Sequence, residues 1–183
     1  MGFLRAWDEQ LLLWLNQAGT PEWDAFMWYI TQTWVWAPLF LGLGIWLLRR
    51  YKRRTWVPIV GVLASVGLTD GLTGRVLKPW VARLRPSHQA SLRPSLRIVR
   101  GYRGGLYGFP SSHAANSAAL LSALWVWLRR PLLLPIGLGW VVLHSGSRVY
   151  LGVHYPSDIL AGWLIGASVG YLLNRLLLKF IWV

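Results

Sequence analysis

Uncharged, strongly apolar runs alternate with short polar stretches along this chain, and this pattern predicts most of its elements. The longest run, from Ala25 to Leu48, is long enough to cross a hydrocarbon core that needs about 20 helical residues. Four shorter uncharged runs follow, at Thr55–Thr69, Ala114–Leu128, Pro131–Ser147 and Ile159–Asn174. Each alone could be a buried helix, but five in series, with tryptophans near many of their ends, fit a polytopic membrane bundle better.

Residues 3–17 precede these runs and have their own periodicity. Leucine and tryptophan recur there at helical spacing, which predicts an amphipathic helix lying in the membrane interface. Its apolar side would consist of Leu4, Trp7, Leu11, Trp14 and Leu15. The segment does not match a cleaved signal peptide, because Asp8 and Glu9 follow closely on Arg5 and no long apolar run begins before Ala25.

The chain is therefore predicted to be all-α, a polytopic membrane helix bundle of about five transmembrane helices plus an N-terminal interfacial amphipathic helix. The predicted spans lie near 25–48, 56–77, 112–128, 132–148 and 157–178. A length of 183 residues suits one domain, 1–183. The single long connection runs from residue 86 to residue 109, and long loops in compact proteins are often functional.

Composition supports a membrane protein and narrows its partners. The chain is 55% hydrophobic and contains 14 tryptophans. Its net charge of +13 does not predict a nucleic-acid partner, since a basic footprint must be exposed and continuous, whereas these cations fall into two groups at opposite ends of the spans. One group, Arg49–Arg54 with Arg129 and Arg130, lies in short loops that the positive-inside rule assigns to the cytoplasm. The other group, from Arg75 to Arg103, would then face outward.

Three short segments, far apart in sequence, carry chemistry at predicted helix boundaries. They are Lys78-Pro-Trp-Val-Ala-Arg-Leu-Arg85-Pro86, then Pro110-Ser111-Ser112-His113, and finally Ser147-Arg148 followed by His154 and Asp158. The predicted topology brings all three to the outer face. Because charge inside an apolar chain is costly, such a set marks a functional site.

The cations and the serines of these segments suit a phosphate dianion. Arg85 and Arg148 can grip phosphate oxygens in a bidentate fork, and Lys78 adds a point charge. Stabilising the transferring group electrostatically is the larger part of catalysis in phosphoryl transfer. The segment 110–113 begins a predicted helix whose free N–H groups favour an anion, and Ser111 or Ser112 can add a hydroxyl donor.

The two histidines supply the groups that can react. His154 and Asp158 are four residues apart, so the carboxylate can hold one imidazole nitrogen and leave the other free to attack. The same pair could bind a metal ion. However, a two-metal phosphatase site needs several carboxylates, and apart from Asp158 the chain has a single acidic residue beyond its N-terminal region, Asp70. We therefore predict a histidine mechanism without a metal or other cofactor, and the absence of cysteine excludes thiolate metal sites.

Asp70 lies inside the second predicted span, where a carboxylate needs a partner. On an ideal helix Lys78 would lie about 80° around the axis from it. Asp70 is therefore expected to support the site only indirectly.

The three segments resemble the signature of the type 2 phosphatidic acid phosphatase superfamily, Lys-x6-Arg-Pro, Pro-Ser-Gly-His and Ser-Arg-x5-His-x3-Asp. The first and third parts match with the family's spacing, and the second matches except that Ser112 replaces glycine. The resemblance implies a metal-independent enzyme in which His154 is the nucleophile, Asp158 orients it and His113 is the general acid. It further implies that the phosphate is held by Lys78, Arg85, Ser111, Ser112 and Arg148.

An integral membrane enzyme with its site at the outer interface is expected to act on a membrane lipid phosphate, with the bilayer as its other partner. Polyprenyl diphosphate, phosphatidate or phosphatidylglycerophosphate, and lipid A are candidates within the family, and polyprenyl diphosphate is slightly preferred. The small size and short loops suggest a bacterial cytoplasmic membrane protein with its site facing the periplasm. Alternatives are a lipid phosphotransferase that uses the same site and a lipid-binding or transport protein; a vanadate-dependent oxidase ranks last.

Overall fold

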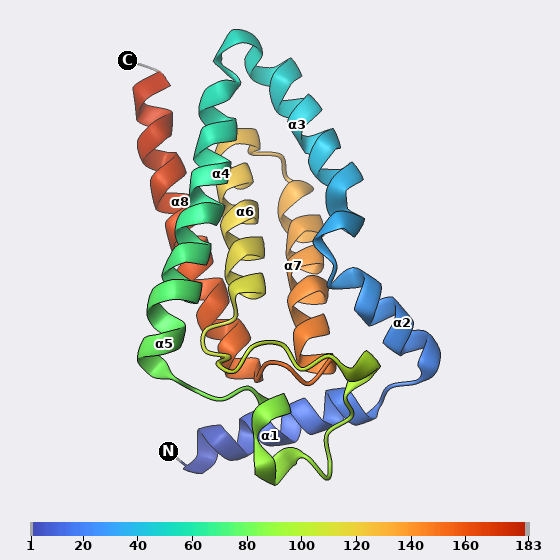
Figure 1. The fold of residues 1–183 in the computed structure, drawn as a ribbon. Helices are drawn as coiled ribbons and strands as arrows, with labels where there is room; N and C mark the ends of the chain where they lie inside the picture. The colour runs from blue at the N-terminus through green and yellow to red at the C-terminus, as the bar shows by residue number, and fades with distance from the viewer. Residues whose placement is uncertain (1, 182–183) are drawn as a thin grey trace.

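The computed structural model describes residues 2–181, and helices dominate this part of the chain (Figure 1). The α-helices are α1 (Gly2–Gln17), α2 (Pro21–Ile30), α3 (Ala37–Tyr51), α4 (Trp56–Gly71), α5 (Lys78–Val81), α6 (Ser112–Leu128), α7 (Leu133–Tyr150) and α8 (Pro156–Ile181). No strand occurs among the described residues, although Leu84 and Tyr107 form one isolated β-bridge. The prediction of an all-α protein is confirmed.

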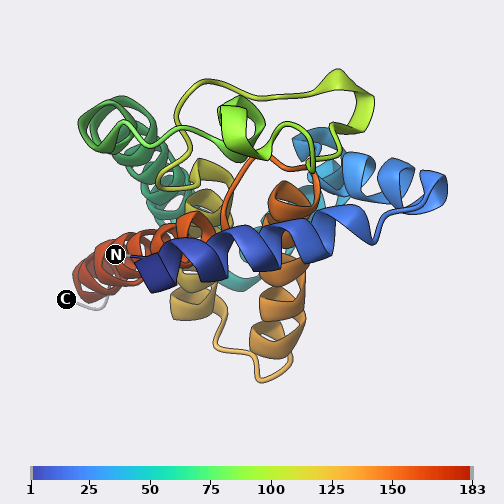
Figure 2. The same ribbon diagram turned by 90° about the horizontal axis from the view of Figure 1, so that it is seen from below.

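α6 lies at the centre of the bundle, with α4, α7 and α8 packed around it (Figure 1). α3 joins α4 at one end of the bundle and diverges from it toward the other end, where α1 lies across the helix ends (Figure 2). Within residues 2–181, two helical segments are long and apolar enough to cross a membrane, Trp56–Val81 and Pro156–Lys179. α2 and the helical segment after it would add a third as one bent span. The protein is thus an integral membrane protein.

The prediction of one continuous span near residues 25–48 is wrong. α2 ends at Ile30 and α3 begins at Ala37, with a bend of 69° between α2 and the following helical segment. Pro38 in the first turn of α3 has no N–H, so an unbroken helix would lack a backbone hydrogen bond there. Instead, Nε1 of Trp36 donates to the carbonyl oxygen of Ile30 at 2.8 Å and satisfies the end of α2.

α4 continues into α5 through a π-helical segment, Leu72–Leu77. A π-helix has more residues per turn than an α-helix, so the rotation from Asp70 to Lys78 is smaller than on an ideal α-helix. Both side chains line one cavity. The ideal-helix separation of about 80° between them does not hold.

Small residues allow α6 and α8 to pack backbone against backbone. Gly162, Gly166 and Gly170 recur every fourth residue on the face of α8 that meets α6. A Cβ atom at Gly166 would lie 1.9 Å from the carbonyl oxygen of Ala115, far inside van der Waals contact. Such small-xxx-small stripes let membrane helices approach closely. This packing fixes the start of α8 against the start of α6.

The two ends of the bundle differ in what they carry. The α3–α4 connection with Arg49–Arg54, and the α6–α7 connection with Arg129 and Arg130, lie at the upper end in Figure 1. The lower end carries the three motif segments, the long connection and α1. The long connection is tied down there, because the side chain of Asn16 accepts from the backbone N of Arg97 at 2.7 Å and donates to its carbonyl oxygen at 3.0 Å.

α1 packs against the rest of the protein through one face and exposes another. Trp7 and Trp14 are exposed, whereas Asp8, Leu12 and Asn16 form the buried face against the rest of the protein. The tryptophans remain available for a membrane interface, and the buried polar residues serve the site described below.

Candidate active site

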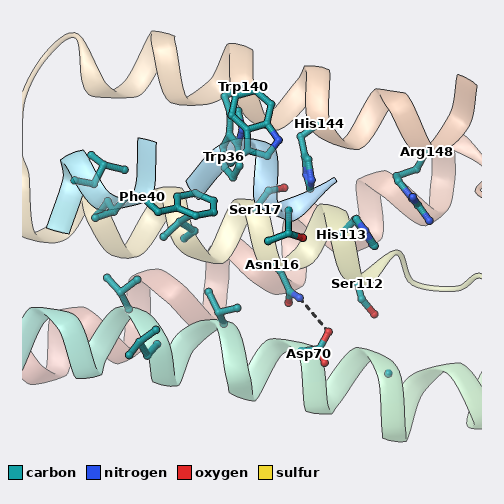
Figure 3. A pocket seen from close by; sticks show the side chains of 18 of the residues that line it. Trp36, Phe40, Asp70, Ser112, His113, Asn116, Ser117, Trp140, His144 and Arg148 are labelled. Carbon is teal, nitrogen blue, oxygen red and sulfur yellow. Dashed lines mark hydrogen bonds between the residues drawn. The ribbon is translucent and has the colours of Figure 1, made fainter. Parts of the chain in front are cut away.

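A cavity of about 820 Å³ lies between α3, α4, α6 and α7 (Figure 3). Its polar end is lined by Lys78, Arg85, Ser112, His113 and Arg148. Its other end is lined by apolar side chains of α3, α4 and α6, including Leu43, Leu47, Ile59, Val62, Leu120 and Leu124. One cavity therefore joins cations suited to phosphate with a surface suited to a hydrocarbon chain.

His154 and Asp158 form a buried pair beside the polar end. His154 lies in the short connection between α7 and α8, and Asp158 lies in the first turn of α8. Nδ1 of His154 is 3.3 Å from Oδ2 of Asp158, which also accepts from the backbone N of Tyr155 at 3.0 Å. Burial, together with the charges of Arg85, Arg148 and Lys78, lowers the pKa of His154 well below 6.5. The imidazole is thus neutral, with Nδ1 turned toward the carboxylate and Nε2 toward the cavity cations.

Arg85 connects this pair to the cavity. Its Nη1 lies 2.8 Å from Nε2 of His154 and donates to the carbonyl oxygen of Val153 at 3.0 Å. Burial lowers the pKa of Arg85 to about 10, so it stays protonated at neutral pH. Gly104, at φ +66°, packs against the guanidinium, and a Cβ there would come within 3.2 Å of it. The long connection is thereby shaped to hold this arginine against His154.

The start of α6 is fixed from two sides. Oγ of Ser112 accepts from Nζ of Lys78 at 2.7 Å and from Oγ1 of Thr73 at 2.9 Å. The backbone N of Ser111 donates to the carbonyl oxygen of Asp158 at 3.0 Å, and its Oγ caps α6 by accepting from Ala114 N at 3.4 Å. Ser111 is fully buried and does not line the cavity, so the phosphate contact expected of it stays a prediction.

Arg148 reaches the cavity from α7 and is oriented by groups outside the three motifs. Nη1 donates to Oγ1 of Thr31 at 2.7 Å, and Nη2 donates to the hydroxyl of Tyr102 at 3.0 Å. Thr31 lies at the break after α2, so the break brings the Thr31 hydroxyl within hydrogen-bonding distance of Arg148. Nε of Arg148 has no hydrogen-bond partner among the described residues.

His113 faces the cavity from the first turn of α6, next to Ser112 (Figure 3). Its ring stacks on that of His144, with centroids 5.6 Å apart, and His144 stacks in turn on Trp140 at 5.4 Å. This column of rings packs against one face of His113. His144 lines the cavity as well.

Two residues that sequence reasoning did not select complete the arrangement around Asp158. Nη1 of Arg83 donates to Oδ1 of Asp158 at 2.9 Å, and Nη2 donates to Oδ2 of Asp8 at 2.7 Å. Asp8 also accepts at 2.9 Å from the backbone N of Ser157, one of the orphan donors at the start of α8. The sequence did contain a hint of these roles. Asp8 and Asn16 are polar residues at helical spacing in an otherwise largely apolar predicted helix, and Arg83 lies inside the first motif.

The three segments expected to meet do meet at one end of the bundle. Lys78, Arg85, Ser112, His113 and Arg148 line one cavity, and the pair of His154 and Asp158 lies directly behind Arg85. Among the described residues, no group of three or more His, Cys, Asp or Glu side chains is arranged so that it could hold a metal ion. Chemically, the site offers a neutral imidazole, a carboxylate behind it, a second imidazole and three cations.

The chain is similar to a known protein superfamily and to several lipid phosphatases. The model of the PAP2 superfamily matches residues 55–182, which include all three segments. A lipid A 4'-phosphatase of Bacteroides thetaiotaomicron is 37% identical over 93% of this chain and 76% of its own length. An undecaprenyl-diphosphatase of Sulfolobus acidocaldarius is 30% identical over 72% of this chain and 68% of its own length.

One solved structure resembles nearly the whole chain. It is the transmembrane PAP2 type phosphatidylglycerolphosphate phosphatase of Bacillus subtilis, with 25% identity and a TM-score of 0.74. The superposition covers 99% of this chain and 87% of that one. The similarity thus extends beyond the segments that carry the motifs.

Proposed function

Because this chain belongs to the PAP2 superfamily and is a membrane phosphatase of lipid phosphates, we propose that it works through a phosphohistidine on His154. The observation that supports this most strongly is the orientation of the imidazole. Asp158 faces Nδ1, and Nε2 is directed at Arg85 on the cavity side. A neutral imidazole held in this way presents a lone pair to phosphorus.

In the first step, Nε2 attacks phosphorus and the bond from phosphorus to the leaving oxygen breaks. His113 gives its proton to that oxygen, so the lipid departs as an alcohol or, from a diphosphate, as a monophosphate. In the second step, water attacks the phosphorus of phosphohistidine while His113 takes up a proton. The P–N bond breaks, inorganic phosphate leaves and neutral His154 is restored.

The cations hold and stabilise the phosphoryl group throughout. Arg85 exchanges its contact with Nε2 for a phosphate oxygen when substrate enters, and Lys78 and Arg148 bind the remaining oxygens. Ser112 positions Lys78 through the 2.7 Å hydrogen bond, and Ser111 fixes the start of α6. No metal or other cofactor takes part in this proposal.

The substrate is a membrane lipid whose chain lies along the apolar end of the cavity. Five spans hold the site at the outer surface: the bent α2–α3 segment, α4 with α5, α6, α7 and α8. α1 lies in the interface with its exposed tryptophans toward the lipid. The arginine-rich connections at the opposite end face the cytoplasm, which supports placement in a bacterial cytoplasmic membrane with the site toward the periplasm.

Phosphate release by purified protein in detergent tests this mechanism. Wild type and His154→Ala are compared on phosphatidate and on undecaprenyl diphosphate with excess EDTA. Release is expected to survive chelation and to fall at least about 1000-fold in the variant, because the attacking group is gone. His88→Ala is the matched control, because it makes the same substitution at a histidine of the long connection that does not line the cavity. Chelation that abolishes wild-type release, or equal release by His154→Ala, would contradict the proposal.

A further inference from the structure

We propose that Asp70 and Asn116 form a subsite for the leaving group of the substrate. The pair selects a phosphate monoester whose leaving group carries hydroxyl or amide N–H donors, such as a phosphorylated amino sugar of a glycolipid, over a lipid diphosphate. This inference rests on the proposed function and names the substrate class of the same site.

The position of the pair supports this role. Hydrogen bonds at two positions join α6 to the helix that runs from α4 to α5. At the first position Ser112 accepts from Lys78 at 2.7 Å and from Thr73 at 2.9 Å, and at the second Asn116 donates to Asp70 at 3.0 Å. Asn116 follows Ser112 by four residues, so the second bond lies about 6 Å further along the cavity wall. Both pairs line the same cavity, and Figure 3 shows Asp70 and Asn116 beyond Ser112.

The position of His113 indicates which part of the substrate would reach Asp70 and Asn116. It lies between Ser112 and Asn116 along α6 and faces the cavity. In the proposed mechanism His113 protonates the leaving oxygen, so the leaving group extends from the phosphate past His113. The first atoms beyond that oxygen therefore meet Asp70 and Asn116.

The chemistry of the pair defines what it accepts. Nδ2 of Asn116 donates to Oδ1 of Asp70, and Oδ1 of Asn116 has no hydrogen-bond partner among the described residues. Within residues 2–181, no ion pair involves Asp70, whose side chain is exposed to the cavity. A carboxylate accepts hydrogen bonds and donates none, and inside a membrane helix it needs a partner. Hydroxyl and amide N–H groups of a substrate supply such partners.

The same carboxylate disfavours a diphosphate. The second phosphate of a lipid diphosphate would occupy the leaving-group position and bring anionic oxygens toward Asp70. Like charges in a partly apolar cavity repel strongly, and such repulsion is a common source of specificity. The cations that could compensate already surround the first phosphate. Asp70 thus attracts one substrate class and repels another.

Three lipids separate these effects in the purified full-length protein with EDTA. They are lipid A carrying a 4'-phosphate, undecaprenyl diphosphate, and dioleoyl phosphatidate, a monoester without donors near its phosphate. Wild type should have its highest kcat/KM on lipid A. Asp70→Asn should lower the preference for lipid A over undecaprenyl diphosphate by about tenfold or more, with the change in phosphatidate hydrolysis falling between the changes for the other two lipids. Glu22→Gln makes the same change of charge and shape in the first turn of α2 and should alter no ratio.

Asn116→Asp tests the inference in the opposite direction. It places a second carboxylate beside the first, so hydrolysis of undecaprenyl diphosphate should fall further than hydrolysis of phosphatidate. A wild-type preference for the diphosphate, or equal effects of both substitutions on all three lipids, would overturn the inference and leave the proposed function standing. Absence of His154-dependent release from every lipid would contradict the proposed function and this inference together.

Discussion

The two carboxylates near the site, Asp158 and Asp70, differ in how many hydrogen bonds they accept from the protein. Asp158 is completely buried and accepts from His154 at 3.3 Å, from Tyr155 N at 3.0 Å and from Arg83 at 2.9 Å. Asp70 faces the cavity and accepts from Asn116 on one oxygen. A carboxylate whose oxygens already accept several hydrogen bonds from the protein is held in one geometry before substrate arrives. A carboxylate with unused acceptor capacity can accept further hydrogen bonds from a ligand. Asp158 thus belongs to the part of the site that the protein holds in place by itself, called the built side below, whereas Asp70 belongs to the part with acceptor capacity left for substrate.

The largest effect on the built side is expected from Asp158→Asn. The amide would turn an N–H group toward Nδ1 of His154 and favour the tautomer whose Nε2 carries the proton, so the nucleophile would be lost. We expect kcat to fall by about 1000-fold or more, as for orienting carboxylates in catalytic triads. Phosphate release gives kcat, and the melting temperature of the detergent-solubilised protein shows whether the fold persists. Near-wild-type kcat in a folded variant would refute the orienting role.

A smaller loss is expected from Asp8→Asn, because Asp8 acts on Asp158 only through Arg83 and Ser157. Weakening the 2.7 Å ion pair with Arg83 should loosen Asp158 without touching substrate. We expect kcat to fall by about 10- to 100-fold and KM to change by less than about threefold. Glu9→Gln is the matched control on the same helix, since Glu9 pairs with exposed Arg5. A change in KM alone would show that Asp8 affects binding instead.

Acidification provides a third test of the built side. In the folded protein the pKa of His154 is lowered well below 6.5, whereas in the unfolded chain it returns to about that value. The unfolded state thus binds more protons as pH falls below 6.5, and stability decreases, by up to about 1.4 kcal/mol per pH unit from this residue. Between about pH 7.5 and 5.5, wild type should therefore lose more melting temperature than His154→Gln, by a few degrees. Equal losses would mean that His154 is not held neutral.

The smallest effect is expected from Ser112→Gly, which restores the residue of the family signature. It removes the hydroxyl that holds Lys78 at 2.7 Å but leaves the backbone N–H and the cation in place. Lys78 then has more freedom, so KM should rise by about threefold with little change in kcat. Steady-state kinetics on phosphatidate measures both constants. A fall in kcat comparable to that of Asp8→Asn would show that Ser112 shapes the reacting geometry itself.

Motif spacing predicted the cations, the serine and the histidine of the three segments that line the polar end of the cavity. His154 and Asp158 are four residues apart, so local geometry pairs them. Lys78, Arg85 and Arg148 stand out because permanent charges are costly next to apolar membrane helices. The partners that orient them were harder to foresee. Thr31, for example, reaches Arg148 only because α2 ends early, and that break depends on Pro38 and on the hydrogen bond from Trp36.

Sequence periodicity located the helices but not their internal irregularities. The predicted spans near 112–128 and 132–148 correspond closely to α6 and α7. The π-helical segment before Lys78 has no clear signature in residue pattern, yet it determines that Asp70 and Lys78 share a cavity. The buried role of Asp8 likewise requires knowing that α1 lies across the start of α8 (Figure 2).

The most direct test of the central claim is to trap the covalent intermediate. Phosphatidate labelled with ³²P is mixed with enzyme, the reaction is quenched in alkali, and the labelled peptide is identified by mass spectrometry. The label should lie on His154, survive alkali and be released by acid, and Asp158→Asn should carry far less of it. Label on His113 or on a serine, or rapid turnover with no labelled protein at any quench time, would contradict the assignment of His154 as the nucleophile.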